Sequence, residues 1–117
     1  MLDTKTILIV DDEAAIRLLF CESLRRYGYH VLEACSGPDA LAVNNGYPKP
    51  IDVLVSDVMM PGMTGFELAH EICAARPQLK VILISGYSEL PADLERGWAF
   101  LQKPFAPSKL CAMLEEL

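Results

Sequence analysis

Apolar and polar residues alternate with two different spacings along this chain. Short apolar runs rich in β-branched residues predict strands at residues 6–10, 29–34, 51–56, 80–85 and 99–103. The first, third and fourth runs are almost continuously apolar, which is typical of strands covered on both faces of a sheet. The segments between the runs instead repeat their apolar residues at helical spacing.

Helices are predicted at residues 14–27, 38–45 and 65–76, and in a last segment that begins at Pro107. The apolar stripe of the first helix consists of Ile16, Leu19, Phe20, Leu24 and Tyr27. A T-x-x-E capping pattern, Thr64 to Glu67, precedes the third helix. Residues 91–97 leave room for a turn or two at most. The alternation predicts an α/β domain of the (βα)5 type, with a doubly wound parallel sheet and a short or irregular fourth helix.

Composition narrows the class of protein. A chain of 117 residues with 52% apolar and 22% charged residues suits a single globular domain, here residues 1–117. The net charge of −6 argues against direct nucleic-acid binding, because phosphate backbones attract basic surfaces. No apolar run approaches the roughly 20 residues that a membrane span needs, and the first residues lack the order of a signal peptide. We therefore expect a cytoplasmic domain without a membrane span.

The cysteines are Cys21, Cys35, Cys73 and Cys111, and they form no C-x-x-C pair. We interpret them as small core residues in a reducing compartment rather than as disulfides or metal ligands.

Chemically reactive side chains follow the ends of the predicted strands. Asp11 and Asp12 follow the first strand, Asp57 the third, Ser85 ends the fourth, and Lys103 lies at the end of the fifth. Ligands of open parallel sheets bind beyond the carboxyl ends of the strands, so these groups are expected to meet at one edge.

Phosphoryl transfer onto a carboxylate requires such a set of groups. Neighbouring carboxylates repel one another, and a hard divalent cation such as Mg²⁺ relieves the repulsion through oxygen ligands. The ammonium of Lys103 and the hydroxyl of Ser85 could neutralise and hydrogen-bond an incoming phosphoryl group. Asp57 would be the nucleophile and would form an acyl phosphate.

Four sequence stretches carry a resemblance to a known family. The stretches "ILIVDDE", "VLVSDVMMPGMTGFEL", "VILISGY" and "FLQKPF" occur in this order and span essentially the whole chain. The chain resembles the receiver domain of two-component response regulators. The resemblance implies a flavodoxin-like fold with strand order 2-1-3-4-5.

The resemblance also implies the role of each site residue. Asp57 would be the phosphoacceptor. Asp12, Asp57 and the backbone carbonyl of Met59 would ligate Mg²⁺ or Mn²⁺ directly, and Asp11 would hold the ion through water. Ser85 and Lys103 would bind the phosphoryl group, and the Lys103–Pro104 peptide bond is typically cis in such domains.

Three further roles follow from the resemblance. Ser85 and Phe100 would form the conformational switch. Met59 and Tyr87 occupy positions that influence hydrolysis of the acyl phosphate, and an apolar Met59 predicts slow self-dephosphorylation. The partners would be a histidine kinase or phosphotransfer protein and an unknown output domain or protein, with no external turnover by the domain itself.

Two features set the chain apart from the usual pattern of the family. Seventeen residues separate Ser85 from Lys103, fewer than is typical of receivers, and in this respect the chain resembles receivers attached to hybrid histidine kinases. Trp98 is the only tryptophan, and we expect it to pack near the proposed site and to report ion binding by fluorescence.

Three alternative functions share this topology or this chemistry. A small aspartate-nucleophile phosphatase would generally need a second acid two residues after the nucleophile, where this chain has Met59. A flavodoxin-like cofactor binder would need a Ser-, Thr- or Gly-rich phosphate loop after the first strand, where this chain has "VDDEAA". A pseudo-receiver would serve only as a docking module that is never phosphorylated.

Overall fold

The computed structural model describes residues 4–86 and 98–117, and within them a five-stranded parallel sheet has the order β2-β1-β3-β4-β5. The strands are β1 (Thr6–Val10), β2 (His30–Ala34), β3 (Val53–Asp57), β4 (Lys80–Ser85) and β5 (Ala99–Gln102). The predicted fold class and strand order are confirmed, and every strand boundary lies within two residues of its predicted place.

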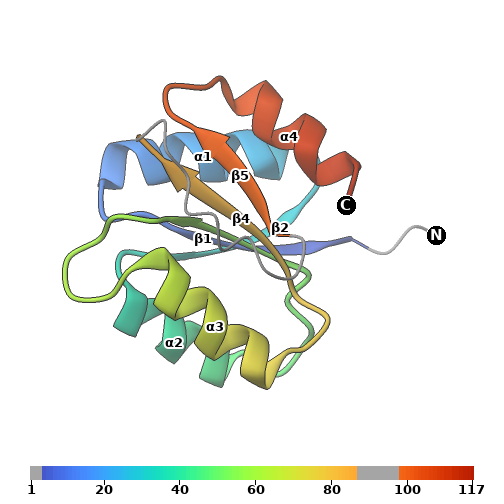
Figure 1. The fold of residues 1–117 in the computed structure, drawn as a ribbon. Coiled ribbons are helices and arrows are strands. Elements are labelled where there is room, and N and C mark those ends of the chain that lie inside the picture. Colours follow the sequence, from blue (N-terminus) through green and yellow to red (C-terminus); the bar gives the residue numbers. More distant parts are fainter. Residues whose placement is uncertain (1–3, 87–97) are drawn as a thin grey trace.

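Helices cover both faces of this sheet (Figure 1). Helices α1 (Ala14–Arg26) and α4 (Pro107–Glu115) lie on one face, and α2 (Gly37–Gly46) and α3 (Gly65–Ala75) lie on the other. Successive residues of a strand point to opposite faces. Ile7 and Ile9 therefore join the core beneath α1 and α4, whereas Leu8 and Val10 join the core beneath α2 and α3. Burial on both faces explains why β1, β3 and β4 read as nearly unbroken apolar runs.

Capping residues mark where two of the helices begin. Thr64 and Glu67 form the predicted capping box at α3, with each side chain accepting a hydrogen bond from the other residue's backbone N–H. Ser36 caps α2 by accepting a hydrogen bond from the Asp39 N–H. The predicted short helix at residues 91–97 lies outside the described residues.

The predicted apolar stripe of α1 is partly wrong. Leu19 and Tyr27 are more than half exposed, whereas Phe20 and Leu24 are buried together with Cys21. Residues 20 and 24 lie one turn apart, and Cys21 lies about 100° around the helix from Phe20 on the opposite side from Leu19. The core therefore meets the Cys21 side of the stripe and leaves the Leu19 side uncovered.

The four cysteines form no disulfide in the structure, and the prediction that all of them are core residues is wrong. Cys21 and Cys111 are buried between the sheet and the helices α1 and α4. Cys73 is half-buried, and Cys35 is exposed because it lies in the turn between β2 and α2. Among the described residues, no helix has the length and apolar character needed to cross a membrane.

Candidate functional site

The strand register brings the predicted site residues to one edge of the sheet. Val10 pairs with Ser56, Asp57 pairs with Ile84, and Ser85 pairs with Gln102. Asp11, Asp57, Ser85 and Lys103 therefore occupy neighbouring positions at the carboxyl ends of four adjacent strands. Parallel pairing alone makes neighbours of residues that are far apart in sequence.

Three carboxylates form an acidic cluster at this edge. One oxygen each from Asp11, Asp12 and Asp57 lies within 4.8 Å of the others. Asp11 is 3% exposed and Asp57 is 6% exposed, whereas Asp12 is exposed to solvent. Oxygen ligands of this kind suit a hard divalent cation such as Mg²⁺ or Mn²⁺, so the residues present fit the ion that the sequence predicts.

Lys103 supplies the positive charge beside the cluster. Its Nζ donates a hydrogen bond to Oδ2 of Asp57 at 3.0 Å, and its side chain is largely shielded from solvent. Burial lowers the pKa of Lys103, but the hydrogen bond to Asp57 and the charges of Asp57, Asp11 and Glu13 outweigh burial and leave the pKa raised. Lys103 is therefore held as a cation next to Asp57. The Lys103–Pro104 peptide bond is cis, as the family resemblance implied.

The carboxyl group of Asp11 is harder to ionise than an ordinary aspartate. Burial raises its pKa, and the charges of Asp57 and Asp12 raise the pKa further. The hydrogen bond from Glu13 and the charge of Lys103 lower the pKa without cancelling the rise. The predicted repulsion among the carboxylates therefore contributes to the raised pKa of Asp11, although burial is the largest cause of the rise.

Three hydrogen bonds fix the backbone and side chain of Asp11. Its N–H donates to the Ala34 carbonyl at 3.3 Å, and its Oδ1 accepts from the Glu13 N–H at 2.9 Å. Its carbonyl accepts from Nη1 of Arg17 at 2.7 Å. The sequence analysis did not identify Arg17. The available signal was a guanidinium within the first turns of a helix that follows two aspartates.

The turn after Asp57 depends on a glycine. The Val58 N–H donates to the Ile84 carbonyl at 2.8 Å, and the Gly65 N–H donates to the Val58 carbonyl at 2.9 Å. A Cβ on Gly65 would overlap the carbonyl oxygen of Asp57, so only glycine lets α3 begin this close to β3. Gly62 supplies the left-handed conformation within the same turn, with φ of 83°. The P-G-M-x-G pattern is therefore the structural support of Asp57.

The structure describes most of the remaining predicted residues. Ser85 is buried, and its carbonyl accepts a hydrogen bond from the Lys103 N–H at 2.8 Å. Met59, two residues after Asp57, is 57% exposed. Tyr87 lies outside the described residues. The role of Met59 as a ligand and the switch role of Ser85 stay predictions.

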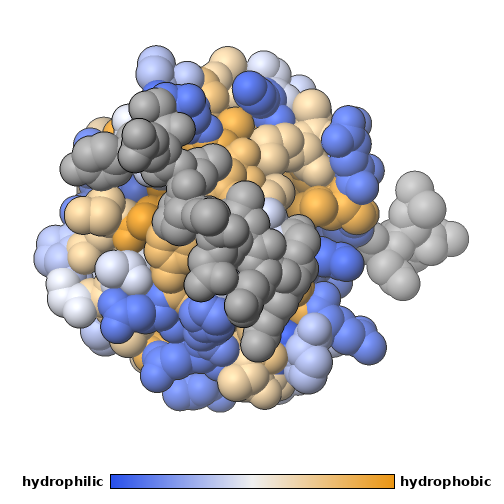
Figure 2. Space-filling view, viewed as in Figure 1, coloured by the Kyte–Doolittle hydropathy of each residue, from blue (hydrophilic) through white to orange (hydrophobic). Residues whose placement is uncertain are grey.

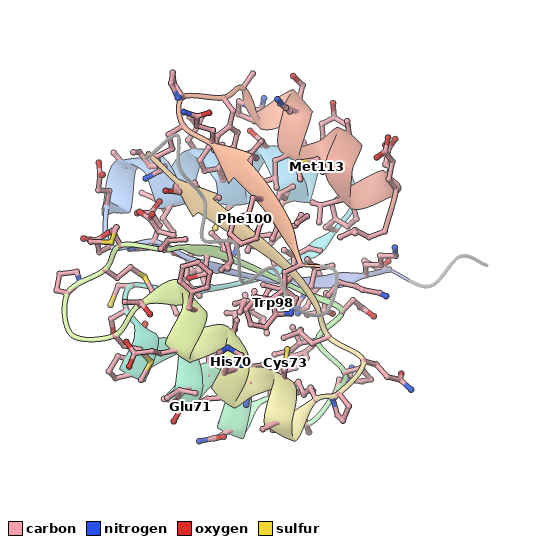
Figure 3. All side chains as sticks on the ribbon, in the orientation of Figure 1. His70, Glu71, Cys73, Trp98, Phe100 and Met113 are labelled. Atoms are coloured by element: carbon pink, nitrogen blue, oxygen red, sulfur yellow. The ribbon has the colours of Figure 1, made fainter. Side chains whose placement is uncertain are left out.

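Phe100 is half-buried on the face of the sheet that α2 and α3 cover. Its ring meets that of Phe66 at the start of α3, with 6.0 Å between centroids. Figure 3 shows Phe100 near the middle of the molecule, and Figure 2, in the same orientation, shows apolar side chains above and to the left of the middle. Its switch role stays a prediction too.

The prediction that Trp98 lies near the site is wrong. Trp98 directly precedes β5 and therefore lies at the amino edge of the sheet, whereas Lys103 follows the carboxyl end of the same strand. Five residues of extended chain at ~3.3 Å each separate the two positions by about 16 Å. The Trp98 ring packs instead against His70 of α3, with 4.9 Å between centroids (Figure 3). The indole is therefore too far away to sense an ion at the acidic cluster directly.

Comparisons with known proteins agree with this geometry. The family model described as response regulator receiver domain matches residues 7–115. The chain is 40% identical over 118 residues to the sensor kinase CckA of Brucella abortus, an alignment that covers 96% of this chain but 12% of that kinase.

Solved structures give the same assignment. A crystal structure of the receiver domain from the hybrid histidine kinase CckA has a TM-score of 0.84 and 37% identity, covering 95% of this chain and 96% of that one. The response regulator TrrA from Thermotoga maritima, solved in complex with Mg²⁺ and BeF, has a TM-score of 0.82 and 34% identity, covering 97% of this chain and 98% of that one.

Proposed function

The chain belongs to the receiver-domain family of two-component response regulators, and from that premise we propose that Asp57 accepts a phosphoryl group from a phosphohistidine in a Mg²⁺-dependent reaction. Receiver domains are signalling modules, so the modified domain is itself the product. The observation that carries the proposal is the convergence of Asp11, Asp12 and Asp57 at one sheet edge, with Lys103 hydrogen-bonded to Asp57.

The chemistry is a displacement at phosphorus. A carboxylate oxygen of Asp57 attacks the phosphorus atom, the P–N bond of the phosphohistidine breaks, and the imidazole nitrogen leaves with the electron pair and takes up a proton. Lys103 orients Asp57 through the 3.0 Å hydrogen bond and offers positive charge to the incoming phosphoryl oxygens. The buried hydroxyl of Ser85 would donate to one of those oxygens once the group is attached.

The metal-binding residues would be Asp11, Asp12, Asp57 and the Met59 carbonyl, with Asp11 acting through water. A divalent cation bound there would offset the charge of the carboxylates and of the phosphoryl group. The similar structure of TrrA in complex with Mg²⁺ and BeF supports this part of the proposal.

The donor and the output belong to the proposal as well. We propose that a histidine kinase or a phosphotransfer protein supplies the phosphoryl group. The phosphorylated domain then changes conformation through Ser85 and Phe100 and so controls a partner or an attached domain in the cytoplasm. The similarity to the receiver of a hybrid kinase supports this placement, although the chain spans about an eighth of that kinase.

A groove beside the site supports a protein donor over a small molecule alone. Leu19, Phe20 and Phe105 line it together with Lys103, and the rings of Phe20 and Phe105 stack at 5.0 Å. A protein that brings a phosphorylated side chain to Asp57 would cover this apolar surface. Leu19→Asp should therefore slow transfer from a protein donor and leave phosphorylation by acetyl phosphate unchanged.

The test of the phosphoacceptor is phosphorylation by acetyl phosphate, read by mass spectrometry of the intact protein. Wild type should gain one phosphoryl group with Mg²⁺ and none with EDTA, and Asp57→Asn should gain none. Asp52→Asn is the matched control, because Asp52 directly precedes β3 at the amino edge of the sheet, where its carboxylate accepts a hydrogen bond from the Thr6 N–H. Phosphorylation of Asp57→Asn at the wild-type rate would contradict the proposal.

A phosphatase is the second candidate, because it would use the same strand-end aspartate. The exposed Met59 offers no second acid for such an enzyme. We therefore expect no sustained hydrolysis of small phosphate monoesters by the domain. Continued turnover, abolished in Asp57→Asn, would favour the phosphatase instead.

A further inference from the structure

Helix α1 begins without a side-chain cap of its own. Glu13 occupies the N-cap position, and its side chain makes no capping hydrogen bond. The backbone that precedes the helix must therefore be held by groups other than the N-cap side chain. Residues 11–13, here called the acidic turn, carry two of the three carboxylates of the cluster. The conformation of this turn decides whether Asp11 and Asp12 face Asp57.

Arg17 connects the acidic turn to the rest of the fold. Its Nη1 donates to the Asp11 carbonyl at 2.7 Å, and its Nε donates to Oε1 of Glu33 at 3.2 Å. Glu33 lies on β2 and pairs with Ile9 of β1, so it is held by the sheet. One planar guanidinium therefore bridges the acidic turn and the edge strand, a geometry that a lysine cannot reproduce.

Burial makes this contact different from an ordinary surface ion pair. The Arg17 side chain is 15% exposed. Arg25 is the other partner of Glu33, with 3.6 Å between its Nη2 and Oε2 of Glu33, and its side chain is 48% exposed. A partly buried hydrogen bond to a backbone carbonyl restrains the backbone, whereas an exposed ion pair contributes little. Arg25 contacts the Val31 carbonyl and Glu33 but not the acidic turn.

We propose that Arg17 is a positioning residue of the cation site, which fixes the acidic turn so that Asp11 and Asp12 face Asp57. The inference rests on the proposed function, since it assumes that the acidic cluster binds Mg²⁺. Groups that orient metal ligands without touching the metal usually change affinity by about 10- to 100-fold when removed. Arg17 acts through its hydrogen bond and not as a ligand.

The test is Mg²⁺ affinity, measured by titration calorimetry without any phosphoryl donor. Arg17→Met should raise the Mg²⁺ dissociation constant about tenfold. Arg25→Met is the matched control: it removes the other partner of Glu33 on the same helix and should change the constant by less than about twofold. Melting temperatures in EDTA report how much each change costs the fold itself.

Arg17→Lys keeps the charge and most of the aliphatic stem, so it serves if Arg17→Met does not fold. An ammonium lacks the planar fork by which Nε and Nη1 of Arg17 reach two separate acceptors, so Mg²⁺ binding should again be weaker than in wild type. Wild-type affinity in a folded Arg17 variant, or equal losses in Arg17→Met and Arg25→Met, would overturn the inference and leave the proposed function standing. No Mg²⁺ binding by wild type would overturn both.

Discussion

Asp11 is the most buried carboxylate of the acidic cluster, and its raised pKa has a consequence for stability. A carboxyl group whose pKa is higher in the folded state holds its proton more tightly there, so stability falls as pH rises from the unfolded value toward the folded one. At neutral pH without divalent cations, the raised pKa of Asp11 therefore costs stability relative to an ordinary aspartate. Below its unfolded pKa of about 4 this cost disappears.

Asp11→Asn should therefore raise the melting temperature in EDTA at pH 7. Asparagine keeps an oxygen that can accept the hydrogen bond from Glu13, while the buried charge is gone. The gain should shrink as pH is lowered toward about 4. Calorimetry resolves it, because 1 kcal/mol corresponds to about 4 °C for a domain of this size.

Asp39→Asn is the control for this substitution. Asp39 is exposed and its Oδ2 accepts a hydrogen bond from the Cys35 N–H, so it shares the bonding of Asp11 without the burial. No gain is expected there. An equal gain in both variants would mean that net charge, and not the acidic cluster, sets the effect.

A second prediction at the residue scale concerns Met59 and the lifetime of the acyl phosphate. Its side chain is exposed two residues after Asp57, and a thioether orients water poorly. Met59→Asn should therefore shorten the half-life of the phosphorylated domain several-fold. The half-life is measured as the loss of phosphoprotein after the phosphoryl donor is removed. Met59→Leu keeps an apolar side chain and should leave the half-life unchanged. Equal half-lives for all three proteins would refute this role for Met59.

At the scale of elements, the contact between β3 and α3 depends on Gly65. A methyl group there would meet the Asp57 carbonyl, which is backbone and cannot move aside easily. Gly65→Ala should reduce the free energy of unfolding by about 1–3 kcal/mol, as overpacking generally does. Urea denaturation measures the change.

Gly46→Ala is the matched control within α2. A Cβ at Gly46 meets nothing within 4 Å, and the residue ends a helix in which alanine is favourable. We expect it to be neutral or slightly stabilising. If Gly65→Ala were as stable as Gly46→Ala, the close approach of α3 to β3 would not require glycine at position 65.

Which parts of these elements could be predicted depends on where their information lies. The strands could be predicted because two covering helix layers make each central strand apolar throughout. The exposed side of α1 could not be predicted, because helical spacing is equally compatible with burial of Leu19 and burial of Cys21. Only packing against the sheet decides which of the two is buried. Arg17 was missed for the same reason, since its partners Asp11 and Glu33 become neighbours only in the folded chain.

For the molecule as a whole, the site residues could be predicted because parallel topology brings strand ends together whatever their sequence separation. That argument places Asp11, Asp57 and Lys103 at the carboxyl edge. It also assigns Trp98, which precedes β5, to the opposite edge, and the sequence analysis did not apply it there. Topology does not predict the conformation of residues 87–97, which connect β4 to β5 and lie outside the described part of the chain.

Binding of a divalent cation should stabilise the entire domain, because the acidic cluster exists only in the folded state. Carboxylates from the ends of β1 and β3 meet within 4.8 Å after folding and are dispersed after unfolding. Mg²⁺ at about one hundred times its dissociation constant should therefore add roughly 2.7 kcal/mol to the free energy of unfolding, or about 10 °C to the melting temperature.

Asp12→Ala removes an exposed carboxylate, so the apo protein should stay folded while the response to Mg²⁺ is lost. Ca²⁺ tolerates more ligands at longer distances, so a smaller shift with Ca²⁺ would indicate a compact site suited to Mg²⁺. No shift of the wild-type melting temperature at any Mg²⁺ concentration, with Asp12→Ala equally unresponsive, would remove the support for a cation at the three carboxylates, and the proposed chemistry at Asp57 would lose its cation.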